Sequence, residues 1–141
     1  MPDYISPYIL KSEYACKCCG KLPPMFEGDP GSVYTDLFDD FSIIRNEWGK
    51  PIPISSGYRC PKYNKLIGGS LLSVHMFGLA LDMDLSTGGE VDSLDAIIEE
   101  VAPHLRRGKY VDTGTFIHID CGYEIYPRVS NSWKQGARWY G

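Results

Sequence analysis

The chain has 141 residues, of which 43% are hydrophobic and 23% are charged, so it is long enough to bury a core but short for two domains. We expect one domain over residues 1–141, with a cysteine-rich entry segment (1–28) and an aromatic tail (127–141). The net charge of −4 is small and no long run of Lys or Arg occurs, which argues against a nucleic-acid partner.

The first residues, from Met1 to Pro7, lack the basic segment and apolar run of a secretory signal peptide. No later stretch approaches the roughly 20 apolar residues of a transmembrane segment. We therefore expect cytoplasmic synthesis, with any action outside the cell depending on lysis or on delivery by a larger particle. The residues up to Pro24 show neither helical nor strand periodicity, which predicts a loop with at most one short helical turn.

Three of the five cysteines lie together at Cys16, Cys18 and Cys19. The odd total argues against a complete set of disulfides, because at least one thiol stays unpaired within the chain. The three could bind a structural zinc ion, but no second close pair completes such a site, and the nearest further cysteine is Cys60. Packed or partly bridged thiols are the alternative that we favour.

Two helices are predicted from apolar residues at helical spacing. Asp29 and Pro30 are typical of the N-cap and first position of a helix that ends at Gly49. Its expected buried face comprises Val33, Leu37, Phe38, Phe41, Ile44 and Trp48. The second helix ends near Pro103, and its expected buried residues are Val91, Leu94, Ile97, Ile98 and Val101. His104 follows this helix, where a solvated imidazole is expected.

Between the two helices, Pro51 to Arg59 is predicted to form a short strand that runs into a turn, because its prolines bar a central ladder position. Arg59 then lies at a strand end. A short helix from Cys60 to Ile67 and a glycine turn at Gly68-Gly69 should follow.

Two further strands are predicted to carry the chemistry of the chain. Residues alternate strictly from Leu79 to Leu85, so Leu81 and Met83 face the core while Asp82 and Asp84 face the other side. After a strand over 109–112 and a turn at 113–115, Phe116 to Cys121 repeats the pattern, with Ile117 and Ile119 inward and His118 and Asp120 outward. The expected fold class is α+β, a small antiparallel sheet flanked by helices.

His75, Asp82 and His118 form a candidate zinc site. Two imidazoles and a carboxylate that leave a fourth position for water are a known catalytic zinc arrangement, in which the ion lowers the pKa of the water to about 7 and polarises a carbonyl. The alternative is that the histidines are isolated and the aspartates lie at strand ends. Placing His118 and Asp120 between core isoleucines is costly, however, unless these polar groups meet a charged partner.

At this point the sequence resembles the zinc D-alanyl-D-alanine carboxypeptidases and dipeptidases, which have the hedgehog-like peptidase fold, and their endolysin relatives. The likeness extends over residues 41–120, and Glu13-Tyr14-Ala15-Cys16 also resembles the entry segment of small phage-borne members. The motifs that carry it are Ser55-Ser56-Gly57-Tyr58-Arg59, Asn64, Gly68-Gly69, Ser73-x-His75-x-x-Gly78-x-Ala80-x-Asp82 and His118-x-Asp120.

The resemblance implies a role for each matching residue. His75, Asp82 and His118 would be the zinc ligands, and Arg59 would hold a carboxylate or carbonyl of the substrate. Ser73 would add a hydrogen bond nearby. The alternative for Arg59 is an ordinary ion pair with Asp84 or Asp120.

Thr115 departs from the family pattern. The carboxypeptidases have an acidic general base three positions before the last histidine ligand, whereas a threonine hydroxyl cannot take up a proton at neutral pH. Asp112, Asp120 or Asp84 could replace it, or the metal alone could activate the water. Of the two roles open to Asp120, base or acceptor of a ligand ring N–H, we favour the second. A Thr115→Glu change should raise hydrolysis if the site geometry otherwise matches that of the enzymes.

Three functions compete at this stage. The first is a monomeric zinc peptidase, carboxypeptidase-like or endolysin-like, that hydrolyses an amide in a peptidoglycan stem peptide or cross-link. The second is a non-catalytic zinc-containing domain that binds peptidoglycan or belongs to a phage particle. The threonine at position 115, in place of the family's acidic residue, favours this second function. The third is a cysteine hydrolase, but no family signature surrounds any cysteine. In the tail, Trp133, Trp139 and Tyr140 either dock on the domain, which we favour, or offer stacking surfaces for sugar.

Overall fold

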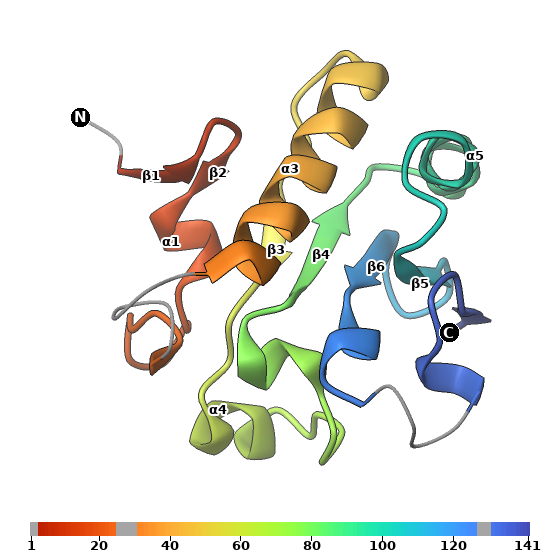
Figure 1. The fold of residues 1–141 in the computed structure, drawn as a ribbon. Helices are drawn as coiled ribbons and strands as arrows, with labels where there is room; N and C mark the ends of the chain where they lie inside the picture. Colours follow the sequence, from red (N-terminus) through yellow and green to blue (C-terminus); the bar gives the residue numbers. More distant parts are fainter. Residues whose placement is uncertain (1–2, 25–30, 127–130) are drawn as a thin grey trace.

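A five-stranded sheet forms the centre of the computed structural model, which describes residues 3–24, 31–126 and 131–141 (Figure 1). Its strand order is β3-β4-β6-β5-β7, and all neighbours pair antiparallel except β5 and β7, which are parallel. The strands are β3 (Ile54–Ser56), β4 (Ala80–Asp84), β5 (Arg106–Tyr110), β6 (Phe116–Asp120) and β7 (Arg138–Tyr140). The structure thus confirms the α+β class.

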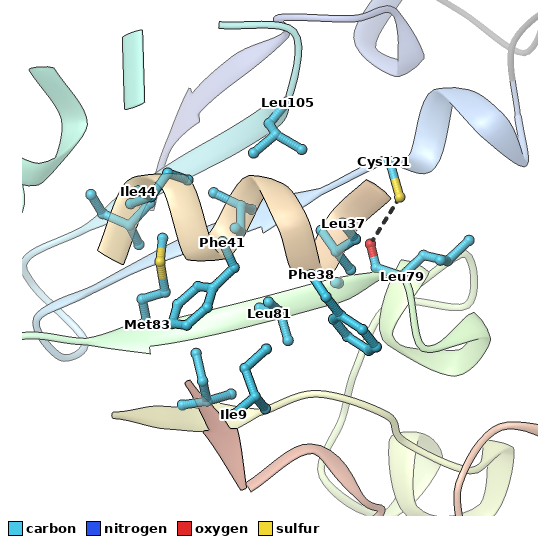
Figure 2. Close-up of a cluster of buried hydrophobic side chains, with 14 of the residues drawn as sticks. Ile9, Leu37, Phe38, Phe41, Ile44, Leu79, Leu81, Met83, Leu105 and Cys121 are labelled. Carbon is cyan, nitrogen blue, oxygen red and sulfur yellow. Dashed lines mark hydrogen bonds between the residues drawn. The ribbon is translucent and has the colours of Figure 1, made fainter. Parts of the chain in front are cut away.

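Helices α3 (Gly31–Trp48) and α5 (Gly88–Val101) contact each other, and the apolar side of α3 packs over β4 (Figure 2). Phe41 and Ile44 of α3 are fully buried, as are Leu81 and Met83 of β4. Both helical faces expected from the sequence are confirmed in their main residues, although Val33 and Trp48 of α3 and Ile97 and Val101 of α5 are only half-buried. The N-cap predicted at residues 29–30 lies outside the described residues.

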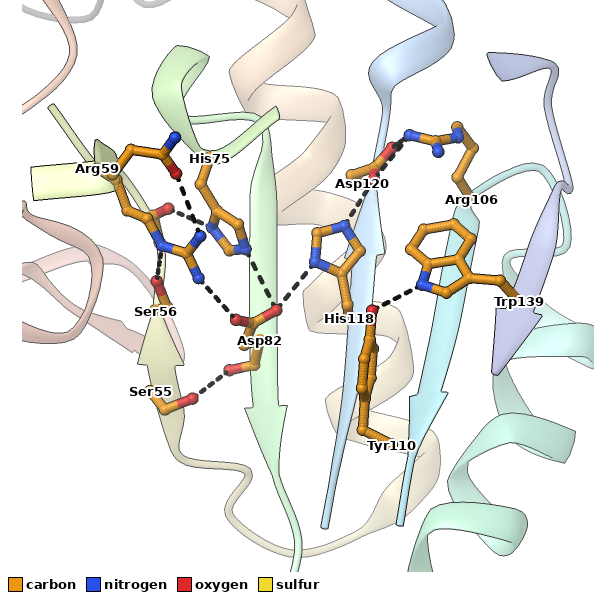
Figure 3. A network of polar contacts seen from close by, with 12 residues as sticks. Ser55, Ser56, Arg59, His75, Asp82, Arg106, Tyr110, His118, Asp120 and Trp139 are labelled. Atoms are coloured by element: carbon orange, nitrogen blue, oxygen red, sulfur yellow. Dashed lines mark hydrogen bonds and ion pairs between the residues drawn. The ribbon is translucent and has the colours of Figure 1, made fainter. Parts of the chain in front are cut away.

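The alternation predicted for β4 and β6 is present. Ile117 and Ile119 of β6 are fully buried beside Leu81 and Met83, while His118 and Asp82 lie on the opposite face of the sheet (Figure 3). Since α3 lies behind the sheet in Figure 3, the core occupies one face and the polar residues occupy the other. A continuous apolar layer therefore backs the site.

The entry segment differs from its prediction. Strands β1 (Tyr4–Ser6) and β2 (Ile9–Leu10) pair antiparallel and lead into the short helix α1 (Lys11–Tyr14). These elements are too short to show a period, and contacts distant in sequence hold them. Tyr14 is fully buried, its hydroxyl donates to Gly78 O at 2.5 Å, and its own carbonyl accepts from Tyr58 N at 2.7 Å.

The remaining elements connect these parts. Helix α4 (Pro61–Leu66) follows β3 as predicted, and the 3-10 turns are η1 (Val74–Phe77), η2 (Gly122–Glu124) and η3 (Asn131–Trp133). Strand β5 begins three residues before its predicted start at Lys109. The tail docks on the sheet through β7, as favoured. Within the described residues, no helix combines the length and apolarity that crossing a membrane would require.

Candidate metal centre

Three side chains from two parts of the chain converge on the polar face of the sheet. In the β4–β6 register His118 lies directly opposite Asp82, and η1 brings His75 to the same point (Figure 3). Asp82 Oδ1 lies 2.9 Å from His118 Nδ1 and 3.2 Å from His75 Nε2. After η1 the chain reverses into β4 at Gly78, whose φ of 73° is in the left-handed region that favours glycine.

The other nitrogen of each ring is fixed by a separate acceptor. His75 Nδ1 donates to the carbonyl of Gly57 at 2.6 Å, which leaves its Nε2 facing Asp82. His118 Nε2 lies 2.6 Å from Asp120 Oδ2, which leaves Nδ1 for the shared point. Outer acceptors of this kind are what set the tautomer and orientation of metal-binding histidines.

The residues fit a zinc ion in type and in spacing. Ligand bonds of 2.0–2.2 Å in a tetrahedron place neighbouring N and O atoms about 3.4 Å apart. The three atoms lie within 4.8 Å of one another, and the two closest pairs are a few tenths of an ångström shorter than that edge. A small outward shift of the rings would therefore admit the ion.

Electrostatics keep the carboxylates of the site ionised. Burial favours the neutral acid, but hydrogen bonds from His118 and His75 outweigh it and hold the pKa of Asp82 well below its usual range. The pKa of Asp120 is likewise lowered, since the hydrogen bond and charge of His118 and the charge of Arg106 outweigh its burial.

The two imidazoles shift in opposite directions. Burial lowers the pKa of His75, although Asp82 opposes the shift. For His118 burial acts the same way, but hydrogen bonds to Asp120 and Asp82 outweigh it and raise its pKa to about 9. A proton on Nδ1 of His118 then occupies the place that a metal ion would take, and the two compete for one lone pair.

The Asp120 carboxylate has hydrogen-bond partners in Arg106, Gly122 and His118. Arg106 Nη1 donates to both carboxylate oxygens at 2.9 Å, the backbone N–H of Gly122 donates at 2.7 Å, and the side chain is 1% exposed. The Arg106 guanidinium in turn lies 4.0 Å from the ring centroid of Trp133. Asp120 therefore has the surroundings of an orienting acceptor for His118, which agrees with the role that we favour from the sequence.

Arg59 points toward the candidate ligands rather than to the partners considered in the sequence. Its Nη2 lies 3.4 Å from Asp82 Oδ2, so an ion pair with Asp84 or Asp120 is not what the structure shows. Its Nε donates to Ser56 Oγ at 3.1 Å, and Nη1 lies 3.5 Å from Asn64 Oδ1. Asn64 is itself fixed by donating to Ser70 O at 2.9 Å. The Ser-Ser-Gly-Tyr-Arg motif and Asn64 thus hold one guanidinium.

A cleft of about 380 Å³ opens over these groups. Ser73, Arg59, Tyr110, Phe116 and Trp139 are among the residues that line it, and Figure 3 shows Arg59 near His75, and Tyr110 and Trp139 near His118. Tyr110 and Phe116 stack with centroids 4.4 Å apart, and Trp139 Nε1 donates to the Tyr110 hydroxyl at 2.7 Å. Trp139 crosses β5 at Gly108, where a Cβ atom would lie 2.3 Å from the indole. The cleft therefore has a polar floor and one aromatic wall.

Two of the three carboxylates considered as a substitute base, Asp84 and Asp112, lie apart from this cleft. Among the described residues that line it, the acidic ones are Asp82 and Asp120, whereas Asp84 and Asp112 are exposed elsewhere. The Thr115 hydroxyl donates to Leu85 O at 2.6 Å and does not line the cleft. The His104 side chain is 39% exposed, in line with the solvated imidazole expected, and its Nε2 also lies 2.7 Å from Asp40 Oδ2.

Sequence reasoning missed four parts of the site. They are Arg106, the carbonyl of Gly57, the side chain of Asn64 as a support for Arg59, and the pair Tyr110–Trp139. A strand assignment starting at Arg106 would have placed this guanidinium opposite Asp120, since the β5–β6 register pairs the two. No local pattern pointed to the others.

Comparison with known proteins identifies the family of the chain. The family model described as Peptidase M15 matches residues 9–120, a span that includes His75, Asp82, His118 and Arg59. The chain belongs to the M15 peptidase family. This membership confirms the resemblance to the zinc D-alanyl-D-alanine carboxypeptidases and makes the protein a member of a zinc-dependent metallopeptidase family. The chain matches no curated protein.

Proposed function

We propose that this M15 protein is a zinc-dependent peptidase that hydrolyses an amide bond in bacterial cell-wall peptides. The observation that carries the proposal is the convergence of His75, Asp82 and His118 beneath an open cleft that also contains Arg59. Three protein ligands with an open fourth position are typical of catalytic rather than structural zinc.

In this proposal His75 Nε2, Asp82 Oδ1 and His118 Nδ1 hold the ion. When bound, zinc supplies a Lewis acid that polarises the scissile carbonyl and makes water a stronger nucleophile at neutral pH. The surrounding residues keep this donor set in place. Gly57 O and Asp120 fix the two rings, and Arg106 fixes Asp120.

Arg59 is proposed to bind the substrate. Its guanidinium lies at the floor of the cleft with its side chain 16% exposed, and its planar fork suits a carboxylate or a carbonyl oxygen. The stem-peptide terminus and the cross-link peptide both offer such oxygens. The stacked Tyr110 and Phe116 would offer a flat apolar wall for the peptide, and Ser73, which also lines the cleft, is proposed to add a hydrogen bond.

The chain is proposed to work without a carboxylate base. Asp82 is a ligand, and the oxygens of Asp120 are already taken by Arg106, Gly122 and His118. With Thr115 bonded to Leu85, no acidic side chain among the described residues that line the cleft is left to accept a proton. The same observation is the support for the second candidate, a zinc-containing domain that binds peptidoglycan or belongs to a phage particle and does not cut.

Purified peptidoglycan provides the test. Protein loaded with zinc should release free amino groups from it, a chelator should stop the release, and added zinc should restore it. His118→Ala protein serves as the matched control with the ligand set broken. Sedimentation with the wall material but no release by the zinc-loaded protein would overturn the peptidase and favour the binding domain.

A further inference from the structure

A second cluster of possible metal ligands lies outside the cleft. Cys16, Cys18, Cys19 and Cys60 present their sulfur atoms within 4.8 Å of one another, and we call these four residues the cysteine cluster. Cys18 Sγ lies 3.7 Å from Cys16 Sγ and 3.4 Å from Cys60 Sγ. The structure has all four as free thiols. Cys60, the nearest further cysteine in the sequence, lies 41 positions beyond Cys19 and completes the group of four.

The backbone arranges the sulfurs from two sides. A turn presents the first three cysteines. Two backbone hydrogen bonds close it: Gly20 N donates to Cys16 O at 2.7 Å, and Cys16 N donates to Lys21 O at 3.0 Å. Cys60 arrives as the N-cap residue of α4. Backbone N–H groups of Cys60 and Tyr63 donate to the sulfurs of Cys16 and Cys60 at 3.3 and 3.4 Å. Such donors stabilise sulfur as a thiolate, the form that binds metal.

We propose that the cysteine cluster binds a second zinc ion, as a closed tetrathiolate site with a structural role. Zinc–sulfur bonds of 2.3 Å in a tetrahedron place neighbouring sulfurs about 3.8 Å apart, close to both measured separations. Four thiolates leave no open position, so the site has no place for substrate. Cys16 is buried while Cys18 and Cys19 are exposed, so an ion can enter from solvent.

The position of the cysteine cluster indicates which segments a bound ion would hold together. The cluster joins the entry segment to the turn between β3 and α4, immediately after Arg59. On the same side, Tyr58 N donates to Tyr14 O, and Tyr14 donates to Gly78 O at the end of η1. The ion would therefore clamp the entry segment against the two segments that present Arg59 and His75. Such a clamp suits a small domain, since metal ligation contributes folding free energy directly.

Metal content measured on the whole chain tests the proposal without relying on activity. Protein purified under reducing conditions should hold about two zinc ions per chain. Cys18→Ser and Cys60→Ser should each lower this to about one, as should His118→Ala, which removes the other site. Cys121→Ala is the matched control, because Cys121 contacts Leu79 O and lies outside the cluster, and it should keep both ions.

Cobalt replacement identifies the ligands. Cobalt-loaded His118→Ala protein should show the strong near-ultraviolet absorption of thiolate-to-cobalt charge transfer, and additional Cys60→Ser should remove it. One zinc per chain that is lost with His118→Ala and retained with Cys60→Ser would overturn the proposal. So would iron in place of zinc, or an intact mass lower by two hydrogens that shows a disulfide within the cluster. None of these readouts requires that the protein cleave peptidoglycan.

Discussion

The two clusters of candidate metal ligands in this protein differ in how the chain forms them. The histidine site (His75, Asp82 and His118) takes two of its ligands from neighbouring central strands backed by the apolar core, and it opens into a cleft. The cysteine cluster takes its ligands from a turn and a helix cap and is closed by its own four sulfurs. An open site with two of its three candidate ligands on a rigid sheet suits chemistry, whereas four candidate ligands between loosely built segments suit a clamp.

The difference also predicts which property of the protein is lost when each ion is removed. The core behind β4 and β6 is formed by fully buried residues such as Leu81 and Ile119, so the sheet does not need an ion to fold. The entry segment consists of a three-residue strand, a two-residue strand and a four-residue helix, which hold little by themselves. Loss of the first ion should therefore cost activity, and loss of the second should cost stability.

Breaking the histidine site should have the largest effect. We expect His118→Ala to reduce hydrolysis of peptidoglycan by about 1,000-fold or more, because metal-ion catalysis supplies several kcal/mol of transition-state stabilisation. Amino-group release and circular dichroism would be measured together. A native circular dichroism spectrum together with lost amino-group release would agree with a site that serves activity rather than folding. Retained amino-group release would mean that the hydrolysis takes place elsewhere.

Breaking the cysteine cluster should affect stability more than chemistry. We expect Cys60→Ser to lower the unfolding temperature by about 6–12 °C, which corresponds to a loss of about 2 kcal/mol in a chain of this size. Calorimetry of Cys60→Ser and of His118→Ala, each with and without chelator, separates the two ions. An unfolding temperature unaffected by chelator in His118→Ala protein would contradict the clamp.

The support of His118 gives a smaller and more specific effect. Asp120→Asn should weaken zinc binding at the histidine site by about 10- to 100-fold, and some turnover should remain at saturating zinc, since the ring loses its charged acceptor but keeps its place. Zinc titration in the Cys60→Ser background measures this one site. If turnover disappears while zinc stays bound, Asp120 is the base instead.

Arg59→Lys tests recognition without loss of charge. Since charge-assisted hydrogen bonds contribute about 1.5–3 kcal/mol, we expect turnover on peptidoglycan fragments to fall by about 10- to 100-fold. Zinc content should stay unchanged, although Arg59 also lies beside Asp82. Unchanged turnover would remove the recognition role, and lost zinc would show that Arg59 supports the ligand instead.

Thr115→Glu should have the smallest effect on rate. In this structure Thr115 directly precedes β6, its hydroxyl donates to Leu85 O and it does not line the cleft, so we expect a carboxylate there to stay away from the metal ligands. The gain that the resemblance implies for a carboxylate at this position is therefore not expected. We expect turnover within about twofold of the unmodified protein and a stability loss of about 1 kcal/mol. A clear increase would show that residue 115 can turn toward the metal.

Sequence periodicity predicted the structure correctly where a single helix or strand sets the direction of the side chains. Alternation placed Asp82 and His118 on the polar face of their strands, and helical spacing identified Phe41 and Ile44 as core. The entry segment escaped prediction because its elements are shorter than any period. Arg106 escaped because the predicted strand began too late to include it.

The sequence by itself determined which side chains share a face, because side-chain direction repeats with the backbone over a few residues. It could not determine that His118 lies opposite Asp82, that Arg106 meets Asp120, or that Cys60 joins Cys16. Those meetings depend on strand register and on contacts between segments 14 to 44 positions apart. Only closure of the whole chain around one core fixes such pairings, since the entropy of bringing distant segments together is offset by burial that no single segment provides.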